Sequence, residues 1–599
     1  MKRFLMGNQA IALGAINAGV NLVSGYPGTP SSEILETVAA NNPGDIYVEW
    51  SANEKAAMEV AAGASYAGAR VMVTMKQVGL SVAADALLSL AYVGIKGGFV
   101  VVVADDPGPI SSQTEQDSRC FGVFAKLPVF DPSSPAEAYL MIEDAFLLSE
   151  KYQIPVIFRP TTRICHACAD LDHNDIRTTN KPSGFIKDSK WVIFPKRAYE
   201  GHLHLASVSK QIAADFSSYG YNSIQGNGRL TIAASGIAYQ YCREALDLLG
   251  QPQIKLAKIA TPTPFPEQFA LSFLQDTDAV ICMEELDPVI EKELLQVVGK
   301  HNLPVKVYGK LTGNLPEAGE YSVETVSAAL ADILGIELPK NEMPQLPDLP
   351  NRPPVLCAAC PHRASFYLVK KACAGQEAVF SGDIGCYTLG NAAPLSMVDT
   401  CLCMGAGITV AQGLQKINPE TLHFAFIGDS TFFASGLTGT VNAAYNQTKI
   451  IIVVLDNNTT AMTGHQPHPG TGQTMMGEIS DKISIEKTLY ALGINSVGVC
   501  NPLDCDRTMA AIKRAIAFPS ASALIMRSPC AVKIKKFTPA KINTDKCSGC
   551  GYCIEELGCP ALTKQNGIIT IDQEHCKGCM LCAQICPCGA IENAITKEE

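Results

Sequence analysis

The residues TLHFAFIGDSTFFASGLTGTVNAAYNQTKIIIVVLDNNTT, numbered 421 to 460, hold two apolar runs separated by a helical stretch. The runs HFAFI (423–427) and IIIVVLD (450–456) are short, continuous and apolar, which is typical of strands covered on both faces. Strands that alternate with helices predict a parallel sheet flanked by helices. Polar residues follow each run, at the ends of two neighbouring strands.

The same rhythm of strand and helix occurs in two further segments. Apolar runs at 71–75, 99–104 and 156–158 alternate with helical stretches, and the pattern restarts at 230. The predicted fold class is therefore α/β with several domains, as expected for a chain of 599 residues. The expected segments are 1–185, 186–340, a proline-rich linker at 341–354, 355–540 and a cysteine-rich tail at 541–599. The N-terminal run is broken by polar residues and predicts a helix, not a signal peptide.

Charge and composition exclude several classes of protein. A net charge of −11 disfavours nucleic acid as a partner, because phosphate binding needs a basic surface. No apolar run is long enough to predict a membrane span. The 23 cysteines are unusual for so long a chain without a signal peptide, and they indicate metal or redox chemistry in the cytoplasm.

Nine of the 23 cysteines lie in the tail, where they form two consecutive runs. Each run has three cysteines at CxxCxxC spacing and a fourth before a proline, a pattern that gives three thiolates to one [4Fe–4S] cluster and the fourth to the other. The first run departs from the usual spacing before its fourth cysteine. The alternative is a zinc-binding or disulfide knot. The predicted ligand sets are Cys547, Cys550, Cys553 and Cys586 for one cluster, and Cys576, Cys579, Cys582 and Cys559 for the other.

Gly428-Asp429-Ser430, followed by Asn457-Asn458, resembles the motif with which proteins bind Mg²⁺ and thiamine diphosphate. Mg²⁺ takes oxygen ligands from the protein and from the phosphates of a cofactor. Asp429 offers a carboxylate, Asn457 an amide oxygen and Thr459 a backbone carbonyl. Ser430 stands where the motif usually has glycine, and a small side chain still permits close approach of the diphosphate.

Thiamine enzymes also need a carboxylate at N1′ of the aminopyrimidine, and that carboxylate comes from a different domain. In YVEWSANEKAAMEV (47–60), Glu54 lies at the expected start of a helix after a short strand. Glu49 on the strand and Glu59 on the helix body are the alternatives, and a solvated or ion-paired role is expected for both.

These motifs together resemble the 2-oxoacid:ferredoxin oxidoreductases over nearly the whole chain, and most closely the large α subunits of the branch acting on indolepyruvate. The resemblance includes GYPGTPSSEI (25–34), CAACPHR (357–363), GDIGCYTLG (382–390) and TGHQPHPGTG (463–472). It implies a pyrimidine-binding domain at 1–185, a transketolase C-terminal-like domain at 186–340, a diphosphate- and Mg²⁺-binding domain at 355–540, and a ferredoxin-like tail.

The same resemblance implies a reaction and its partners. An aryl 2-oxoacid, indolepyruvate first, is decarboxylated oxidatively, coenzyme A accepts the acyl group, and ferredoxin removes the electrons. A smaller β subunit is expected in a heterotetramer of two large and two small subunits, since no segment is left for a further catalytic domain. The alternatives are another 2-oxoacid, a non-oxidative thiamine decarboxylase, or an electron-transfer subunit whose catalytic centre lies elsewhere.

Several residues take expected roles from the family. Thr29 lies in the substrate-side loop, although a simple Gly/Pro turn would look the same. Gly385 is expected to let the backbone approach the diphosphate. His465 and His468 follow the Mg²⁺ loop and either face the substrate or are exposed. A proximal third [4Fe–4S] cluster is expected from Cys357, Cys360, Cys386 and Cys530, with structural thiols as the alternative.

Cys165-x2-Cys168 has no second half elsewhere in the chain and is interpreted as two ordinary small side chains.

Overall fold

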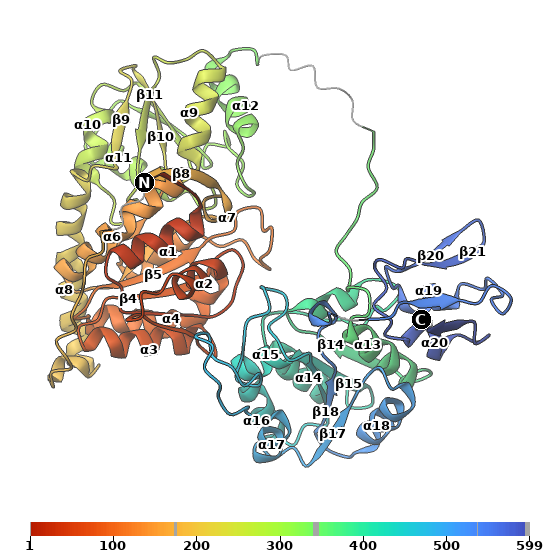
Figure 1. Ribbon diagram of the computed structural model, residues 1–599. Helices are drawn as coiled ribbons and strands as arrows, with labels where there is room; N and C mark the ends of the chain where they lie inside the picture. The colour runs from red at the N-terminus through yellow and green to blue at the C-terminus, as the bar shows by residue number, and fades with distance from the viewer. Residues whose placement is uncertain (1, 173–175, 339–346, 536, 594–599) are drawn as a thin grey trace. The chain divides into compact units, whose positions relative to one another are not determined.

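The computed structural model describes residues 2–172, 176–338, 347–535 and 537–593. The chain divides into two compact units, Met1–Gln345 and Leu346–Glu599, and each is described by itself (Figure 1). Residues 341–346 of the expected linker lie outside the described residues, and the smaller domain boundaries stay predictions. None of the described helices is both long and apolar enough to cross a bilayer.

The first sheet of unit 1 has six parallel strands in the order β3-β2-β4-β5-β7-β6. Helices cover both faces, with α1, α2 and α6 packed together on one side and α3 and α4 on the other (Figure 1). The strands are β2 Leu22–Gly25, β3 Tyr47–Trp50, β4 Val71–Lys76, β5 Phe99–Ala104, β6 Val129–Phe130 and β7 Val156–Phe158. The helices are α1 Gly7–Asn17, α2 Ser32–Ala40, α3 Glu54–Tyr66, α4 Gln77–Val93, α5 Ser118–Ala125, α6 Pro135–Tyr152 and α7 Thr162–His166.

The second sheet of unit 1 has the order β13-β12-β10-β11-β9, and only β9 runs antiparallel to its neighbour. Helices α9 and α12 cover one face, and α10 and α11 cover the other. The strands are β9 Ser223–Gln225, β10 Leu230–Ala234, β11 Lys255–Lys258, β12 Ala279–Met283 and β13 Lys306–Tyr308. The helices are α8 Pro195–Ser217, α9 Ala238–Leu248, α10 Glu267–Leu274, α11 Val289–Lys300 and α12 Val323–Leu334.

Unit 2 is built on a five-stranded parallel sheet in the order β14-β15-β16-β18-β17. The two quoted apolar runs form β15 and β16, which lie side by side, as predicted. Helices α13 and α18 cover one face, and α14, α16 and α17 cover the other. The strands are β14 Ala378–Ser381, β15 Leu422–Gly428, β16 Ile451–Asp456, β17 Ser496–Cys500 and β18 Ser522–Arg527. The helices are α13 Pro361–Ala372, α14 Ala406–Ile417, α15 Asp429–Thr431, α16 Leu437–Tyr445, α17 Ile485–Ala491 and α18 Cys505–Ala517.

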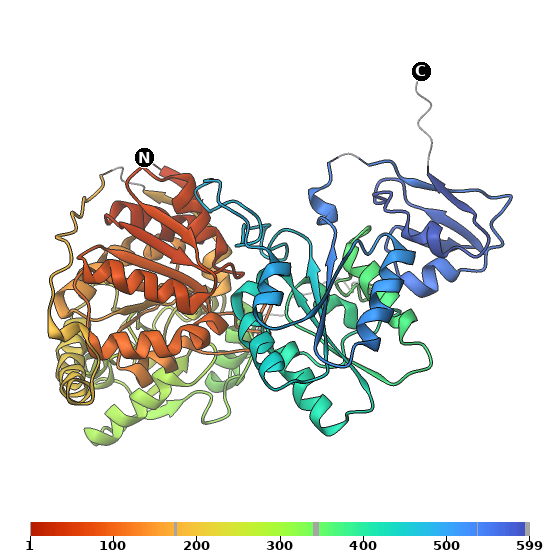
Figure 2. The same cartoon turned by 90° about the horizontal axis from the view of Figure 1, so that it is seen from below.

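The cysteine-rich tail is a small part of unit 2 with two antiparallel strand pairs, β19 with β22 and β20 with β21. Its first helix, α19, packs against α13 (Figures 1 and 2). The elements are β19 Ala540–Ile542, α19 Tyr552–Leu557, β20 Leu562–Gln565, β21 Ile568–Ile571, α20 Leu581–Ile585 and β22 Ile591–Asn593.

The structure confirms the α/β class and corrects one local expectation. The N-terminus begins with a strand, β1 Lys2–Met6, which pairs with β8 Cys168–Asp172 before helix α1 starts. At the start of the tail, Ala540–Ile542 pairs with Ile591–Asn593 near its end. Pairing over more than 40 residues leaves no local signal in the sequence.

Candidate cofactor and electron-transfer sites

Glu54 is the first residue of α3, and its side chain is buried. Asn53 caps the helix by accepting a hydrogen bond from the Ala56 N–H at 2.9 Å, which fixes the first turn. The Glu54 carboxyl lies against Gly79 of α4, where a Cβ atom would come within 2.6 Å of Oε1. A side chain at position 79 would therefore displace the carboxyl.

Burial raises the pKa of Glu54 to about 7, and a backbone hydrogen bond and Lys76 act in the opposite direction. A carboxyl with a pKa near neutrality holds or releases a proton in the range where enzymes work. The two alternatives differ from it: Glu59 is exposed and paired with Lys55, and Glu49 accepts hydrogen bonds from Tyr47 and Ser51. Burial thus distinguishes Glu54 from Glu49 and Glu59 as the candidate carboxyl.

A further charged side chain, that of Lys76, lies at the same edge of the first sheet. Lys76 ends β4, and burial lowers its pKa while Asp106 and Glu54 act to raise it. The side chain of Lys76 lies against Gly28. A Cβ atom added at position 28 would come within 3.0 Å of it. The carbonyl of Thr29 accepts a hydrogen bond from Ser111 Oγ at 3.2 Å. The Gly28-Thr29 loop therefore lies beside a charged group that sequence reasoning missed, because a lysine at a strand end belongs to no motif.

In unit 2, Asp429 connects the ends of two neighbouring strands. Its Oδ2 accepts a hydrogen bond from the Asn458 N–H at 2.7 Å, and its Oδ1 accepts one from the Ser430 N–H at 2.9 Å. Asn457 Oδ1 accepts from the Thr459 N–H at 3.2 Å in the same turn. The carboxylate is thereby held against the turn that carries the amide and carbonyl oxygens. Oxygen donors gathered in this way suit Mg²⁺.

The loop after β14 is closed by Tyr387. A Cβ atom on Gly385 or on Gly428 would come within 2.6 or 2.5 Å of its ring. The hydroxyl donates a hydrogen bond to Asp383 Oδ2 at 2.9 Å, and Asp383 also accepts one from the Gly405 N–H at 2.7 Å. The close approach that Gly385 permits in this structure is thus that of an aromatic ring, and the approach of a diphosphate stays a prediction.

His362 and Asp383 were not found from the sequence, and both are buried, His362 beside Asn457 and Asp383 in the loop after β14. Burial lowers the pKa of His362 to about 4, so the imidazole is neutral, and its Nε2 lies 3.4 Å from Asn457 Nδ2. Burial raises the pKa of Asp383 to about 6. The only sequence signal for His362 was its position two residues after Cys360.

His468 is buried, so the exposed alternative does not hold for it. Its Nε2 lies 3.2 Å from Asp429 Oδ2, and its Nδ1 accepts a hydrogen bond from the Gly470 N–H at 3.1 Å. His465 is half-buried with a φ of 68° in the same loop. Contact of either histidine with a substrate stays a prediction.

The four cysteines expected to hold a proximal cluster gather in unit 2. Burial raises the pKa of Cys360 to about 12, and the thiolates of Cys386 and Cys357 raise it further. Burial likewise raises the pKa of Cys386 to about 11, with further contributions from Cys530 and Cys357. These mutual effects link all four thiols, which come from three separate parts of the chain.

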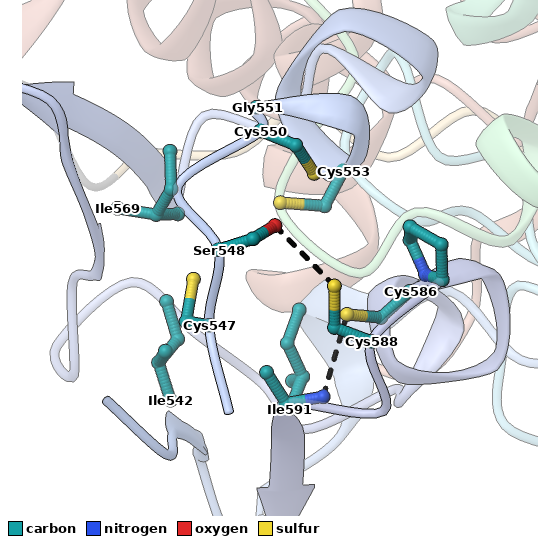
Figure 3. Close-up of a pocket in the computed structure, with 12 residues that line it drawn as sticks. Ile542, Cys547, Ser548, Cys550, Gly551, Cys553, Ile569, Cys586, Cys588 and Ile591 are labelled. Carbon is teal, nitrogen blue, oxygen red and sulfur yellow. Dashed lines mark hydrogen bonds between the residues drawn. The ribbon is translucent and has the colours of Figure 1, made fainter. Parts of the chain in front are cut away.

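The first predicted tetrad of the tail lines a single small cavity (Figure 3). Its wall contains all four expected ligands, together with Ser548, Cys588 and three isoleucines. Cys586, from the second run of cysteines, lines the same cavity as the other three, and their role as ligands of one cluster stays a prediction. Cys588, which has no partner in either run, lies 3.3 Å from Ser548 Oγ. The expected ligands in this wall are Cys547, Cys550, Cys553 and Cys586.

The thiols of the second predicted tetrad of the tail lie close enough to affect one another's pKa. Burial raises the pKa of Cys582 to about 12, and Cys579, Cys559 and Cys576 each raise it further. Cys559 therefore lies near enough to the second run to affect its thiols, and its role as a ligand of that cluster stays a prediction. Of the remaining CxxC pair, Cys165 is buried and Cys168 is an exposed residue of β8.

Three family models match the chain in the order of its parts. The model described as "Pyruvate flavodoxin/ferredoxin oxidoreductase, thiamine diP-bdg" matches residues 13–186. "Thiamine pyrophosphate enzyme, C-terminal TPP binding domain" matches 383–526, and "4Fe-4S dicluster domain" matches 539–587. The matched ranges contain Glu54, Asp429 and all eight tail cysteines that are predicted as ligands.

Full-length relatives agree with these matches. The chain is 40% identical to "Indolepyruvate oxidoreductase subunit IorA" of Methanothermobacter marburgensis, over 98% of this chain and 97% of the relative. It is also 40% identical to the subunit of that name from Archaeoglobus fulgidus, over 99% and 98%. A solved 2-oxoglutarate:ferredoxin oxidoreductase from Magnetococcus marinus is 18% identical, covers 55% of this chain and 65% of its own, and has a TM-score of 0.45.

The two thiamine-binding segments and the cluster-binding tail define a ferredoxin-dependent 2-oxoacid oxidoreductase that binds thiamine diphosphate and [4Fe–4S] clusters. Within this class the chain belongs to the family of indolepyruvate oxidoreductase subunits IorA.

Proposed function

We propose that this chain is the large subunit of an enzyme that decarboxylates aryl 2-oxoacids oxidatively, with indolepyruvate as the preferred substrate, and forms CO₂ and an acyl-CoA. The observation that carries the proposal is the similarity over nearly the full length to subunits named for indolepyruvate. A non-oxidative decarboxylase has no use for two complete cysteine tetrads in its tail. An electron-transfer subunit has no use for two segments that match thiamine-binding models.

The chain's own residues take distinct roles toward the cofactor. Bound thiamine diphosphate supplies the nucleophilic carbon that the protein lacks. Glu54 holds and moves a proton at N1′ of the aminopyrimidine, a role that its raised pKa supports. Asp429, Asn457 and Thr459 bind Mg²⁺ and orient the diphosphate, and Gly428, Ser430, Gly385 and Cys386 line its loop. Thr29 faces the reacting end of the substrate.

We further propose three [4Fe–4S] clusters. Two are held by the tail tetrads, and a proximal one is held by Cys357, Cys360, Cys386 and Cys530. The mutual electrostatic effects among these last four thiols support the third site. Such clusters accept and release electrons one at a time, which suits delivery to ferredoxin.

Replacing Asp429 with alanine is expected to weaken binding of Mg²⁺ and thiamine diphosphate together by at least about tenfold, since the carboxylate balances the charge of the metal. Isothermal titration of the anaerobic protein with the cofactor and Mg²⁺ measures this effect. Asp456→Asn is a matched control at the end of the neighbouring strand, because Asp456 is already paired with Arg527. Unchanged cofactor affinity in Asp429→Ala would remove this residue from the metal site.

The complete enzyme is expected to need a smaller β subunit, in a heterotetramer of two large and two small subunits. Anaerobic assays of viologen or ferredoxin reduction test both substrate and assembly. We expect reduction to require coenzyme A and the small subunit, with the highest kcat/KM for indolepyruvate among phenylpyruvate, pyruvate and branched 2-oxoacids. Release of CO₂ without reduction of the dye would indicate a non-oxidative decarboxylase, and full activity of this chain alone would contradict the need for a partner.

A further inference from the structure

Arg363, in the first turn of α13, is a buried cation without a carboxylate partner among the described residues. Three of its hydrogen bonds go to backbone carbonyls instead. Nη1 donates to the oxygens of Leu557 and Gly558, the latter at 2.9 Å, and Nη2 donates to the oxygen of Leu356 at 2.6 Å. Its Nε is buried with no hydrogen-bond partner in the part of the chain that the structure describes.

The three carbonyls tie Arg363 to two different cysteine tetrads. Leu356 directly precedes Cys357 of the proximal tetrad, and Gly558 directly precedes Cys559 of the second tail tetrad. The backbone N–H of Arg363 donates to the Cys360 oxygen at 3.1 Å. The guanidinium therefore lies where the backbones that present these two tetrads meet, although the residues are nearly 200 positions apart.

The electrostatics of the side chain point to the same two tetrads. Burial lowers the pKa of Arg363, and the thiolates of Cys559, Cys360, Cys579 and Cys357 oppose that effect. Arginine nevertheless stays charged in proteins. A buried charge is costly unless it is compensated, and no carboxylate compensates this one among the described residues. The negative charge that can compensate the Arg363 guanidinium is that of the thiolates of the two tetrads.

We propose that Arg363 is a positioning residue for electron transfer, which raises the reduction potentials of the centres held by the proximal tetrad and by the second tail tetrad. The inference rests on the proposed third cluster. One electron that leaves the proximal centre oxidises it by one unit and reduces the tail centre by one unit, with no bond or proton transferred. The reduced form of each centre carries one more negative charge, so a nearby buried cation stabilises it more than the oxidised form.

The test is an EPR-monitored redox titration of the anaerobically purified, cluster-loaded chain carrying Arg363→Met. At a fixed ambient potential, the ratio of reduced to oxidised protein at the two neighbouring centres is expected to fall about tenfold, which is about 59 mV for a one-electron couple. The centre held by Cys547, Cys550, Cys553 and Cys586 serves as an internal reference and is expected to keep its ratio. Arg363→Lys keeps the charge and is expected to restore most of the potential.

Lys371→Met is a matched control, because Lys371 lies on the same helix but pairs with Glu556 and is partly exposed. Its removal is expected to leave all the potentials unchanged. Unchanged potentials in iron-loaded Arg363→Met, or equal shifts at all three centres, would overturn the inference. If Arg363→Met loses iron, the potentials of the same centres are measured in Arg363→Gln and compared with those of Arg363→Lys.

The two proposals fail in different ways. If the unsubstituted chain binds about eight iron atoms and not twelve, the third cluster is wrong. The tail centre next to Cys559 would then still report whether Arg363 sets its potential.

Discussion

Glu54→Gln is expected to reduce turnover by at least about a hundredfold while thiamine diphosphate still binds. Glutamine keeps the shape of the side chain but cannot take up the proton that a carboxyl exchanges at N1′. Turnover is measured by anaerobic viologen reduction of the complete enzyme, and binding by calorimetry. Glu59→Gln is the control on the same helix, where the carboxylate is exposed and paired with Lys55. Near-normal turnover in Glu54→Gln would mean that another carboxylate does this work.

The same substitution is expected to stabilise the cofactor-free chain above neutral pH. The pKa of Glu54 is raised from 4.5 to about 7, so its contribution to stability is fully present below about 4.5 and is lost as the pH rises through 7. Ionising the buried carboxyl at pH 8 costs on the order of 3 kcal/mol, and glutamine avoids this cost. We expect a higher Tm for Glu54→Gln at pH 8 and a difference that shrinks toward pH 5. A difference independent of pH would contradict this account.

Cys386→Ala is expected to remove about four of about twelve iron atoms and one EPR signal from the full-length chain. The remaining clusters would still be present, but electrons would lose their exit from the thiamine site, so turnover is expected to fall to near background. Iron analysis and EPR spectroscopy of the anaerobically reduced protein measure the first effect.

Cys373→Ala is the matched control for that experiment. Cys373 is buried at the end of α13, and burial alone raises the pKa of its thiol to about 11. Its loss is expected to leave the iron content unchanged. If Cys386→Ala keeps all the iron of the unsubstituted protein, the four proximal cysteines are structural thiols.

The features that could be predicted from the sequence are those that a short stretch of residues encodes. The runs before Asp429 and Asn457 are apolar, continuous and bounded by polar residues, so both strands and their shared edge were predictable. The spacing of the tail cysteines likewise carried the prediction that Cys586 joins the earlier run. In each case local pattern and long-range structure agree.

What could not be predicted depends on contacts between distant segments. Arg363 is one ordinary arginine in CAACPHR, and its partners Leu557 and Gly558 come almost 200 residues later. Lys76 lies close enough to Glu54 to affect its pKa only because the fold brings the end of β4 beside the start of α3. The strand at 540–542 could not be predicted, because nothing near it in the sequence reveals its partner at 591–593.

The exchange of ligands between the two cysteine runs has a consequence for how the tail matures. Cys547, Cys550 and Cys553 line a cavity whose fourth thiol, Cys586, is synthesised 33 residues later. With the proposed ligand sets, neither centre is complete while only one run is present, so we expect insertion of iron to follow synthesis of both. Because metal binding is coupled to folding, loss of one proposed centre to oxygen is expected to loosen the segment that carries the ligands of the other. Exposure of the tail to protease after aerobic handling would therefore report the loss of either cluster.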